Sequence, residues 1–201
     1  YKSIVVFIPS LSGGGAERVA IYLANELAGR KGLKVTLITL NYRKDLLNLV
    51  SSQVKVVPLY HRFKLISYIR LSTLFCFGKF DLWLSHLRVA NILTGALNRM
   101  LFWKKTKCIL VEHTDIIDAL SFNKSERWLS WLVKIAYQNS HICSVSEGSR
   151  DSLNKFLNRN DCKHIPNPVY TESFQKECKK RYITRPRTDF LKLLYVGRLS
   201  Q

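Results

Sequence analysis

The sequence is poor in acidic side chains. Its 201 residues include 14 Asp and Glu against 32 Lys and Arg, which leaves a formal net charge of +18. Such a positive field attracts polyanions, which include nucleic acid, anionic lipid and phosphorylated substrates. The net charge alone does not show which of these three classes of partner the protein binds. The apolar fraction of 47% is ordinary for a globular protein, so the composition argues against disorder.

Closely spaced cysteine pairs are absent. The cysteines are scattered along the chain, at Cys76, Cys108, Cys143, Cys162 and Cys178. An odd number of cysteines without Cys-x-x-Cys spacing argues against a disulfide framework and against a zinc site. Two of them lie inside apolar runs, where a reduced thiol acts as a small hydrophobic side chain. We therefore expect a reducing, cytoplasmic environment.

Long apolar runs are absent as well. The longest one, at 65–77, is interrupted by Arg70 and is too short to span a bilayer as a helix. The apolar run near the start of the chain ends at Pro9 and does not fit a signal peptide. The sequence therefore predicts neither a membrane span nor a secretory signal.

Short apolar runs alternate with segments of helical periodicity. Runs rich in β-branched residues predict strands buried on both faces, and apolar residues three and four apart predict helices. Strands are expected at 4–8, 35–40, 54–59, 81–85, 108–111, 142–145 and 162–165. Helices are expected at 16–27, 63–77, 89–102, 125–137 and 146–157, the last one with Ser146 as its cap. In the helix at 125–137, the residues expected on one buried face are Trp128, Leu129, Leu132, Val133 and Ala136.

This order predicts an α/β fold, a Rossmann-like doubly wound parallel sheet over residues 1–169. Residues 170–190 are polar and basic and contain Pro186, which is typical of a linker. Residues 191–201 restart a buried strand that runs into Gly197 and Arg198, which predicts the beginning of a second domain.

Ligands of an open parallel sheet bind outside the carboxyl ends of its strands. The loop after the first strand contains Gly13, Gly14 and Gly15, and it leads directly into a helix. Glycines permit a close approach of the backbone, and the free amides of a helix start favour an anion. A plain tight turn explains the glycines equally well, because neither Gly-x-Gly-x-x-Gly nor a P-loop is present. Glu17, in the first helical turn, suits the helix dipole.

Two histidines follow predicted strands. His113 comes after the strand at 108–111, where a histidine can act as an acid, a base or a donor to a sugar hydroxyl or phosphate. A capping or buried structural histidine is the alternative interpretation of this position. His86 stands in a similar place, and for it the structural interpretation is favoured.

Taken together, these loops resemble the amino-terminal half of a GT-B glycosyltransferase of the large retaining family 4. The matching segments are Pro9-Ser10-Leu11-Ser12-Gly13-Gly14-Gly15-Ala16-Glu17-Arg18, Val111-Glu112-His113-Thr114, Ser144-Val145-Ser146-Glu147, Ile165-Pro166-Asn167-Pro168-Val169 and Val196-Gly197-Arg198-Leu199. The glycine-rich segment is similar to that of members that build lipid-linked oligosaccharides, lipopolysaccharide or capsule.

The resemblance implies two Rossmann-like domains that face each other across a cleft. The first mainly holds the acceptor, and the second mainly holds a nucleotide-diphosphate sugar. The glycine loop is then expected to approach the donor diphosphate, His113 to contact the transferred sugar, and Arg198 to neutralise the diphosphate. Candidate acceptor-binding residues are His86, Arg88, Asn91, Glu112 and Glu17. No cofactor is expected beyond the donor substrate, and the absence of an Asp-x-Asp motif agrees with a metal-independent transfer.

The resemblance also leads us to expect that residues 1–201 alone do not catalyse transfer, because most of the donor domain would lie beyond Gln201. The basic and aromatic segments at 60–70 and 103–107 suit an anionic membrane surface, although a core helix with a solvated basic edge is the alternative. We therefore expect a cytoplasmic protein that docks peripherally on the membrane.

Two other functions are weaker alternatives. A basic nucleic-acid-binding module would need a basic recognition helix or an aromatic sheet-face motif, and neither is present, so no nucleic-acid partner is expected. A Rossmann oxidoreductase would need the dinucleotide-binding glycine pattern that the first loop lacks.

Overall fold

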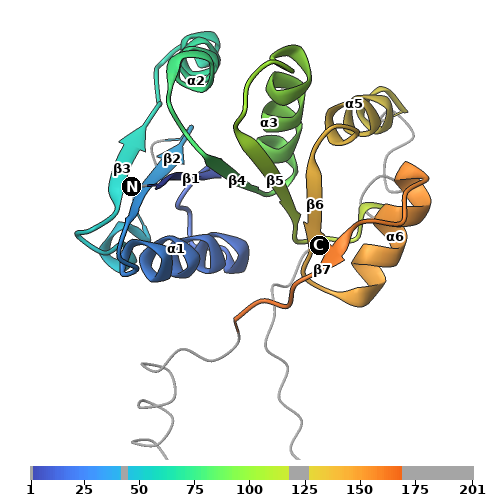
Figure 1. Cartoon of the computed structure of the whole chain (residues 1–201), viewed down its shortest axis with the longest axis horizontal. Helices are drawn as coiled ribbons and strands as arrows, with labels where there is room; N and C mark the ends of the chain where they lie inside the picture. The colour runs from blue at the N-terminus through green and yellow to red at the C-terminus, as the bar shows by residue number, and fades with distance from the viewer. Residues whose placement is uncertain (1, 42–44, 118–126, 169–201) are drawn as a thin grey trace, which may run out of the picture. The chain divides into compact units, whose positions relative to one another are not determined.

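The fold is a single parallel sheet covered on both faces by helices (Figure 1). A computed structural model describes residues 2–41, 45–117 and 127–168. The strands are β1 (Lys2–Ile8), β2 (Leu33–Thr39), β3 (Lys55–Pro58), β4 (Leu82–His86), β5 (Lys107–Glu112), β6 (His141–Ser144) and β7 (Lys163–His164). The helices are α1 (Gly15–Ala28), α2 (Lys64–Phe77), α3 (Arg88–Met100), α5 (Arg127–Tyr137) and α6 (Glu147–Leu157), with a short 3₁₀ turn η1 (Leu47–Leu49).

The strand order is β3-β2-β1-β4-β5-β6-β7, and every pairing is parallel. The chain first winds outward from β1 to β3 and then returns to the other side of β1 with β4. This reversal makes the sheet doubly wound and confirms the fold class predicted from the sequence. Figure 1 shows α1 and α6 on one face of the sheet and α2, α3 and α5 on the other.

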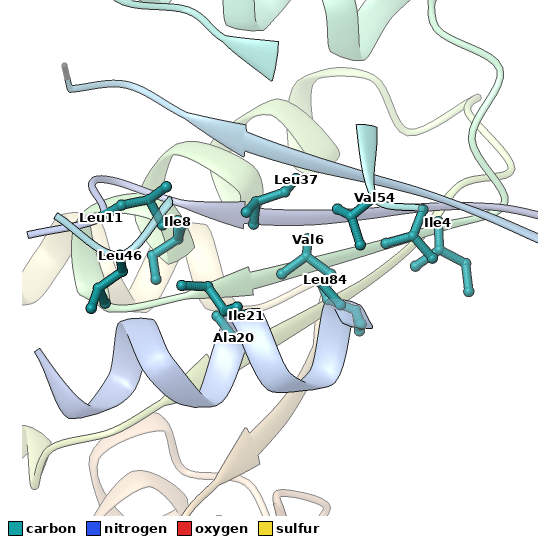
Figure 2. Packing of buried hydrophobic residues seen from close by; sticks show 12 residues of the cluster. Ile4, Val6, Ile8, Leu11, Ala20, Ile21, Leu37, Leu46, Val54 and Leu84 are labelled. Atoms are coloured by element: carbon teal, nitrogen blue, oxygen red, sulfur yellow. The ribbon is translucent and has the colours of Figure 1, made fainter. Parts of the chain in front are cut away.

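The two faces of β1 anchor separate parts of the core. Ile4, Val6 and Ile8 point toward α1, where Ala20 and Ile21 pack against them (Figure 2). The alternate residues Val5 and Phe7 point to the other face, where the core includes Leu71, Phe75 and Trp83. Complete burial of a large apolar side chain contributes roughly 1.5–3 kcal/mol, which explains why a strand buried on both faces reads as an uninterrupted apolar run.

Helix α2 buries only a narrow stripe. Its buried residues are Ser67, Leu71 and Phe75, which are spaced four apart and lie on one line along the helix. The opposite side leaves Leu65 and Ile69 more than half exposed, at 69% and 54%. The solvent-facing side of α2 therefore mixes these apolar side chains with the exposed cations Lys64 and Arg70, so burial alone does not choose between a membrane-facing helix and a core helix with a solvated basic edge.

Helix α5 corrects one prediction. Val133 and Ala136 are buried as expected, but Trp128 is 63% exposed. Trp128 lies five residues before Val133, which places the two side chains about 140° apart around an α-helix. The buried face of α5 is instead completed by Tyr137, which follows Ala136 directly and is fully buried.

The cap predicted for α6 is confirmed, because the Ser146 hydroxyl accepts a hydrogen bond from the Ser149 amide at 3.2 Å. The chain separates into two compact units, Tyr1–Asn167 and Pro168–Gln201, and the sheet belongs to the first. The predicted linker at 170–190 and the predicted strand at 191–201 lie outside the described residues. Among the helices that the structure describes, none has both the length and the apolarity needed to cross a bilayer.

The cysteines of the described ranges are free thiols, and Cys108, Cys143 and Cys162 are buried. Burial raises the pKa of Cys108 to about 12, so this thiol stays protonated at neutral pH. These side chains therefore act as core residues, as two of them were expected to.

Candidate functional site

The candidate site lies where the strand order reverses. β1 pairs with β2 on one side and with β4 on the other, and β5 pairs with β4. The loops that follow β1 and β4 lead into α1 and α3, which lie on opposite faces of the sheet (Figure 1). Diverging connections of this kind open a crevice at the carboxyl ends of the strands. The loops after β1, β4 and β5 therefore frame one site.

The glycine loop after β1 is a helix start with an unusual backbone. Gly13 has a φ of 104°, a region that L-residues rarely adopt. Gly14 is the N-cap of α1 and has no side chain with which to cap it. A Cβ on Gly15 would meet nothing within 4 Å, so the space above the first helical residue is open. The loop thus offers backbone that a ligand can approach closely.

Glu17 closes the glycine loop from inside the helix. Its carboxylate accepts hydrogen bonds from the hydroxyls of Ser10 at 2.7 Å and Ser12 at 2.8 Å, and also from the Gly14 amide. Burial by itself would raise the pKa of Glu17, but these hydrogen bonds outweigh burial and lower the pKa. The ionised carboxylate therefore occupies part of the anion-attracting helix start and holds the loop in shape.

A histidine pair joins the ends of β4 and β5. Nδ1 of His86 and Nε2 of His113 lie 3.1 Å apart, within hydrogen-bonding distance. His86 is 1% exposed, and burial, followed by the neighbouring His113, lowers its pKa to about 3. His113 is half-buried, and burial lowers its pKa as well. Both rings are therefore neutral at pH 7, and His113 is the one that reaches the surface.

The connection from β4 to α3 is strained. Leu87 has a φ of 73° and a ψ of 149°, a region that is nearly reserved for glycine. A non-glycine residue there costs on the order of 1–3 kcal/mol and persists only where its surroundings demand it. Leu87 packs against the core beneath α1 and lies between His86 and Arg88. The strained backbone therefore lies between the two candidate site residues His86 and Arg88.

A second network surrounds Glu112, the last residue of β5. Its buried carboxylate accepts hydrogen bonds from the hydroxyls of Thr114 at 3.0 Å and Tyr137 at 2.8 Å. Arg88 donates to the Thr114 hydroxyl at 3.2 Å, which brings its guanidinium to the same cluster. Complete burial, with Glu112 beside it, raises the pKa of Tyr137 well above its usual value, so the phenol remains a donor.

Asn91 ties helix α3 to two strands. Its Oδ1 accepts a hydrogen bond from the Ser85 hydroxyl at 2.7 Å, and its Nδ2 donates to the carbonyl of Val111 at 3.0 Å. The side chain is fully buried. Asn91 thus fixes the distance between the loops that carry Arg88 and His113.

The structure separates the residues singled out in the sequence into two groups. His113 and Arg88 are partly exposed, and Gly13 and Gly15 have open space beside them. The other candidates are buried and engaged within the protein, namely His86, Asn91, Glu112 and Glu17. Arg198 lies outside the described residues.

The sequence analysis gave no individual role to Thr114, Tyr137 or Ser149, although Thr114 stands in one of the segments that match the family. Thr114 bridges Arg88 and Glu112, and its carbonyl accepts a hydrogen bond from the Ser149 hydroxyl at 3.1 Å. The signal for Tyr137 was present, since a tyrosine at the end of an amphipathic helix buries its ring and must find a partner for its hydroxyl. For Thr114 and Ser149 the signal was their position after predicted strands, which did not show which partners they meet. Among the described residues, no three His, Cys, Asp or Glu side chains are grouped so as to hold a metal ion.

The family model Glycosyltransferase Family 4 matches residues 13–173, well over half of the chain. The chain belongs to glycosyltransferase family 4. The match begins at the glycine loop and includes the histidine pair and the Glu112 network. Comparison of the sequence with curated proteins gave no match.

Solved structures with this fold include three that are 10–13% identical to the chain. The apo form of the lipopolysaccharide outer core galactosyltransferase WaaB aligns with a TM-score of 0.59, 85% of this chain and 47% of that one. The N-terminal domain of trehalose-6-phosphate phosphatase from Candida albicans aligns with a TM-score of 0.62, 92% of this chain and 52% of that one. A ugt transferase from Siraitia grosvenorii, in complex with UDP, aligns with a TM-score of 0.53, 89% of this chain and 55% of that one. At these identities the likeness concerns the fold, and the chain spans about half the length of each neighbour.

The family 4 domain also has a basic hollow far from this site. It measures about 520 Å³ and lies at the amino ends of β1, β4 and β5, the sheet edge opposite the crevice. Its lining includes the lysines Lys2, Lys79, Lys104, Lys105 and Lys107 and one acidic residue, Asp81. Because the carboxyl-end loops are on the other edge, we assign this hollow no part in sugar transfer.

Proposed function

We propose that this family 4 protein transfers a sugar from a nucleotide-diphosphate sugar to a lipid-linked or polysaccharide acceptor, of the lipopolysaccharide or capsule type, with retention of anomeric configuration. The observation that carries the proposal is the placement of the glycine loop after β1 and of His113 after β5 around one switch point, in a chain that the family model matches. Because the chain spans about half the length of its solved neighbours, we place most of the donor site on a second domain.

In the proposed reaction, the bond between the anomeric carbon and the diphosphate oxygen breaks while the acceptor oxygen bonds to the same carbon. Attack occurs on the face from which the diphosphate leaves, and a phosphate oxygen takes the acceptor proton. Negative charge therefore grows on the diphosphate. Preorganised backbone amides and Arg198 stabilise that charge, so no metal ion is required.

The glycine loop contributes its backbone to this stabilisation. The Glu17 carboxylate already accepts a hydrogen bond from the Gly14 amide, so this amide is not available to the diphosphate in our proposal. The open space over Gly15 is the approach that remains, and it adjoins the positive end of α1. Glu17 therefore shapes the donor loop in our proposal and does not bind the acceptor.

His113, Arg88 and Thr114 are the side chains that we place against the bound substrates. They lie after β5 and at the start of α3, where Thr114 is exposed and His113 and Arg88 are partly exposed. His86, Asn91 and Glu112 hold them in place through the hydrogen bonds described above. This arrangement follows the usual division between contacting groups and the buried groups that orient them.

We further propose that the protein is cytoplasmic and docks on an anionic membrane through the face covered by α2, α3 and α5. Those three helices contain no Asp or Glu, whereas α1 and α6 contain two acidic residues each. Exposed large apolar side chains gather on the same face and its edges, at Phe63, Leu65, Ile69, Phe77, Val89, Met100, Phe102, Trp103, Trp128 and Trp131. Aromatic and aliphatic side chains mixed with cations and free of acids suit a layer of anionic headgroups.

The transfer is tested with the whole protein and a panel of nucleotide-diphosphate sugars, with release of the nucleotide diphosphate as the readout. We expect His113→Ala to lower kcat/KM by about 10²-fold, the loss typical of one preorganised donor. His141→Ala is the matched control, since His141 is exposed at the amino end of β6. Failure of every donor, or full activity in His113→Ala, would contradict the proposal.

A paired substitution tests the donor loop. Gly15→Ala adds a Cβ into open space, so the domain should unfold at the wild-type temperature while the KM for the donor rises. Gly14→Ala instead places a Cβ 2.7 Å from a carboxylate oxygen of Glu17, so this variant should lower stability. An unchanged donor KM in Gly15→Ala would show that the diphosphate does not approach this loop.

A further inference from the structure

Among the described residues, none is a hydrogen-bond partner for the buried nitrogen of His86 that faces away from His113. Nε2 of His86 is shielded from solvent and makes no hydrogen bond to any described residue. Nδ1 of the same ring is the atom that meets Nε2 of His113. A neutral imidazole carries one proton, so one nitrogen is a donor and the other an acceptor. The pair therefore has two possible arrangements.

The two arrangements differ in what they leave buried. If His113 donates from Nε2, His86 must carry its own proton on Nε2, and this N–H is then buried without an acceptor. If His86 donates from Nδ1, only a lone pair of Nε2 is left without a partner. Buried N–H groups without acceptors are rarer in proteins than under-satisfied acceptors. The second arrangement is therefore the favoured one.

We propose that His86 is a positioning residue that holds His113 as a neutral ring protonated on Nδ1, so that His113 presents a hydrogen-bond donor and not a proton acceptor to the site. The inference rests on the proposed function only where it concerns activity. In this arrangement Nε2 of His113 is occupied by the proton of His86. His113 then serves sugar transfer by donating to a hydroxyl or phosphate oxygen.

The surroundings keep His113 neutral. If Nε2 of His113 were protonated, its N–H would point at the N–H on Nδ1 of His86. The proton of His86 would then have to move to Nε2, where it has no acceptor among the described residues. The other ionisable groups of the loops that carry the pair and of the network beside them are Arg88 of α3, Glu112 and Asp115 of the β5 end and Tyr137 of α5. Glu112 is engaged by two hydroxyls, and the lowered pKa values of both histidines agree with a neutral pair.

The first experiment reads the tautomers directly in the whole wild-type protein. Side-chain ¹H–¹⁵N spectra at pH 7 should show His86 and His113 protonated on Nδ1 and bare on Nε2. A spectrum with the proton on Nε2 of His113, or with either ring charged, would overturn the proposal. This readout needs no substrate, so it stands apart from the question of sugar transfer.

The second experiment uses two variants of the buried ring. His86→Asn keeps an N–H near the position of Nδ1, and we expect near-wild-type kcat with Nδ1-protonated His113. His86→Phe fills the space but removes the donor, and we expect kcat to fall about 10-fold, as for loss of an orienting partner. His141→Asn serves as the control for a histidine change at an exposed position.

The pH profile separates positioning from general damage. Without the donor of His86, Nε2 of His113 can take a proton, so His86→Phe should lose activity as the pH falls through the ordinary histidine range near 6.5. The wild type and His86→Asn should stay flat there. Parallel profiles for all three proteins would refute the inference. If His113→Ala is fully active while the spectra show the expected tautomers, the proposed role of His113 in transfer fails and the tautomer assignment stands.

Discussion

At the scale of the residue, the candidate site contains polar side chains that are partly exposed and polar side chains that are buried behind them and hold them by hydrogen bonds. His113 and Arg88 reach the surface, while His86, Asn91 and Glu112 are almost completely buried. A buried polar group without partners costs roughly 1–3 kcal/mol, so each of these is hydrogen-bonded at least once. The buried supporting residues are therefore expected to be sensitive to substitutions that remove their hydrogen bonds.

Glu17 gives a residue-scale prediction that depends on pH. We expect Glu17→Gln to lower the free energy of unfolding at pH 7 by about 1–3 kcal/mol, because three donors lose their charged acceptor. The folded state lowers the pKa of Glu17 below its ordinary value, so this contribution is fully present above that ordinary value and is lost as the pH falls through the folded pKa. Urea unfolding at several pH values measures the difference between the two proteins.

The control for this experiment is Glu26→Gln, on the same helix but at an exposed position. Its effect should be within about 0.5 kcal/mol at every pH, as for most surface substitutions. A Glu17→Gln cost that does not shrink on acidification would show that the carboxylate is not the source of the stability.

At the scale of the element, the contact between α3 and α5 sets the position of Tyr137 and therefore of Glu112. Gly95 makes this contact possible, because a Cβ there would lie 2.1 Å from the backbone carbonyl oxygen of Ala136. The backbone of Ala136 cannot move aside as easily as the end of a flexible side chain could. The two helices consequently approach only where α3 has no side chain.

Two glycine-to-alanine substitutions test this contact. Gly95→Ala should destabilise the protein by about 1–3 kcal/mol, the range for overpacking. Gly148→Ala, on the exposed first turn of α6, meets nothing within 4 Å and should be neutral or stabilising by up to about 1 kcal/mol. Thermal unfolding of both variants compares them directly, and equal stabilities would contradict the proposed close approach of α3 to Ala136.

At the scale of the whole molecule, charge is distributed unevenly between the two faces of the sheet. The cations of α2, α3 and α5 are Lys64, Arg70, Arg88, Arg99, Arg127 and Lys134, and no acid on these helices offsets them. On α1 and α6 the acids Glu17, Glu26, Glu147 and Asp151 accompany three cations. The helices of the proposed membrane face therefore carry only positive formal charge, whereas the acids of α1 and α6 outnumber their cations by one.

Vesicle binding tests the proposed membrane face. We expect co-sedimentation with vesicles that contain anionic phospholipid, weaker binding at high salt, and no binding to neutral vesicles. The double variant Leu65→Ser and Ile69→Ser should weaken binding without loss of fold, because both side chains are mostly exposed. The control replaces Arg18 and Arg30, which belong to the α1 side.

Equal loss of vesicle binding in the control would show that only net charge matters. Salt-sensitive binding to oligonucleotides but not to vesicles would replace the membrane with nucleic acid as the partner of this face.

The local sequence determined the elements and their order. A strand buried on both faces, such as β1, must be apolar throughout. The apolar residues of a helix such as α1 must repeat every 3.6 residues. Both patterns can be recognised in the sequence alone. Once the strands are recognised, the loops that follow them can be located in the sequence as well. Hence the glycine loop and His113 could be singled out from the sequence.

Only the tertiary structure decided which polar residues meet. His86 and His113 are 27 positions apart, and Glu112 and Tyr137 are 25 apart, so their contacts depend on strand order and helix rotation. Trp128 is a different case, since the 3.6-residue helical period alone places it about 140° from the buried Val133. Periodicity fixes which residues share a side of an element, but packing against neighbours sets how that side is turned, and the site is built from those choices.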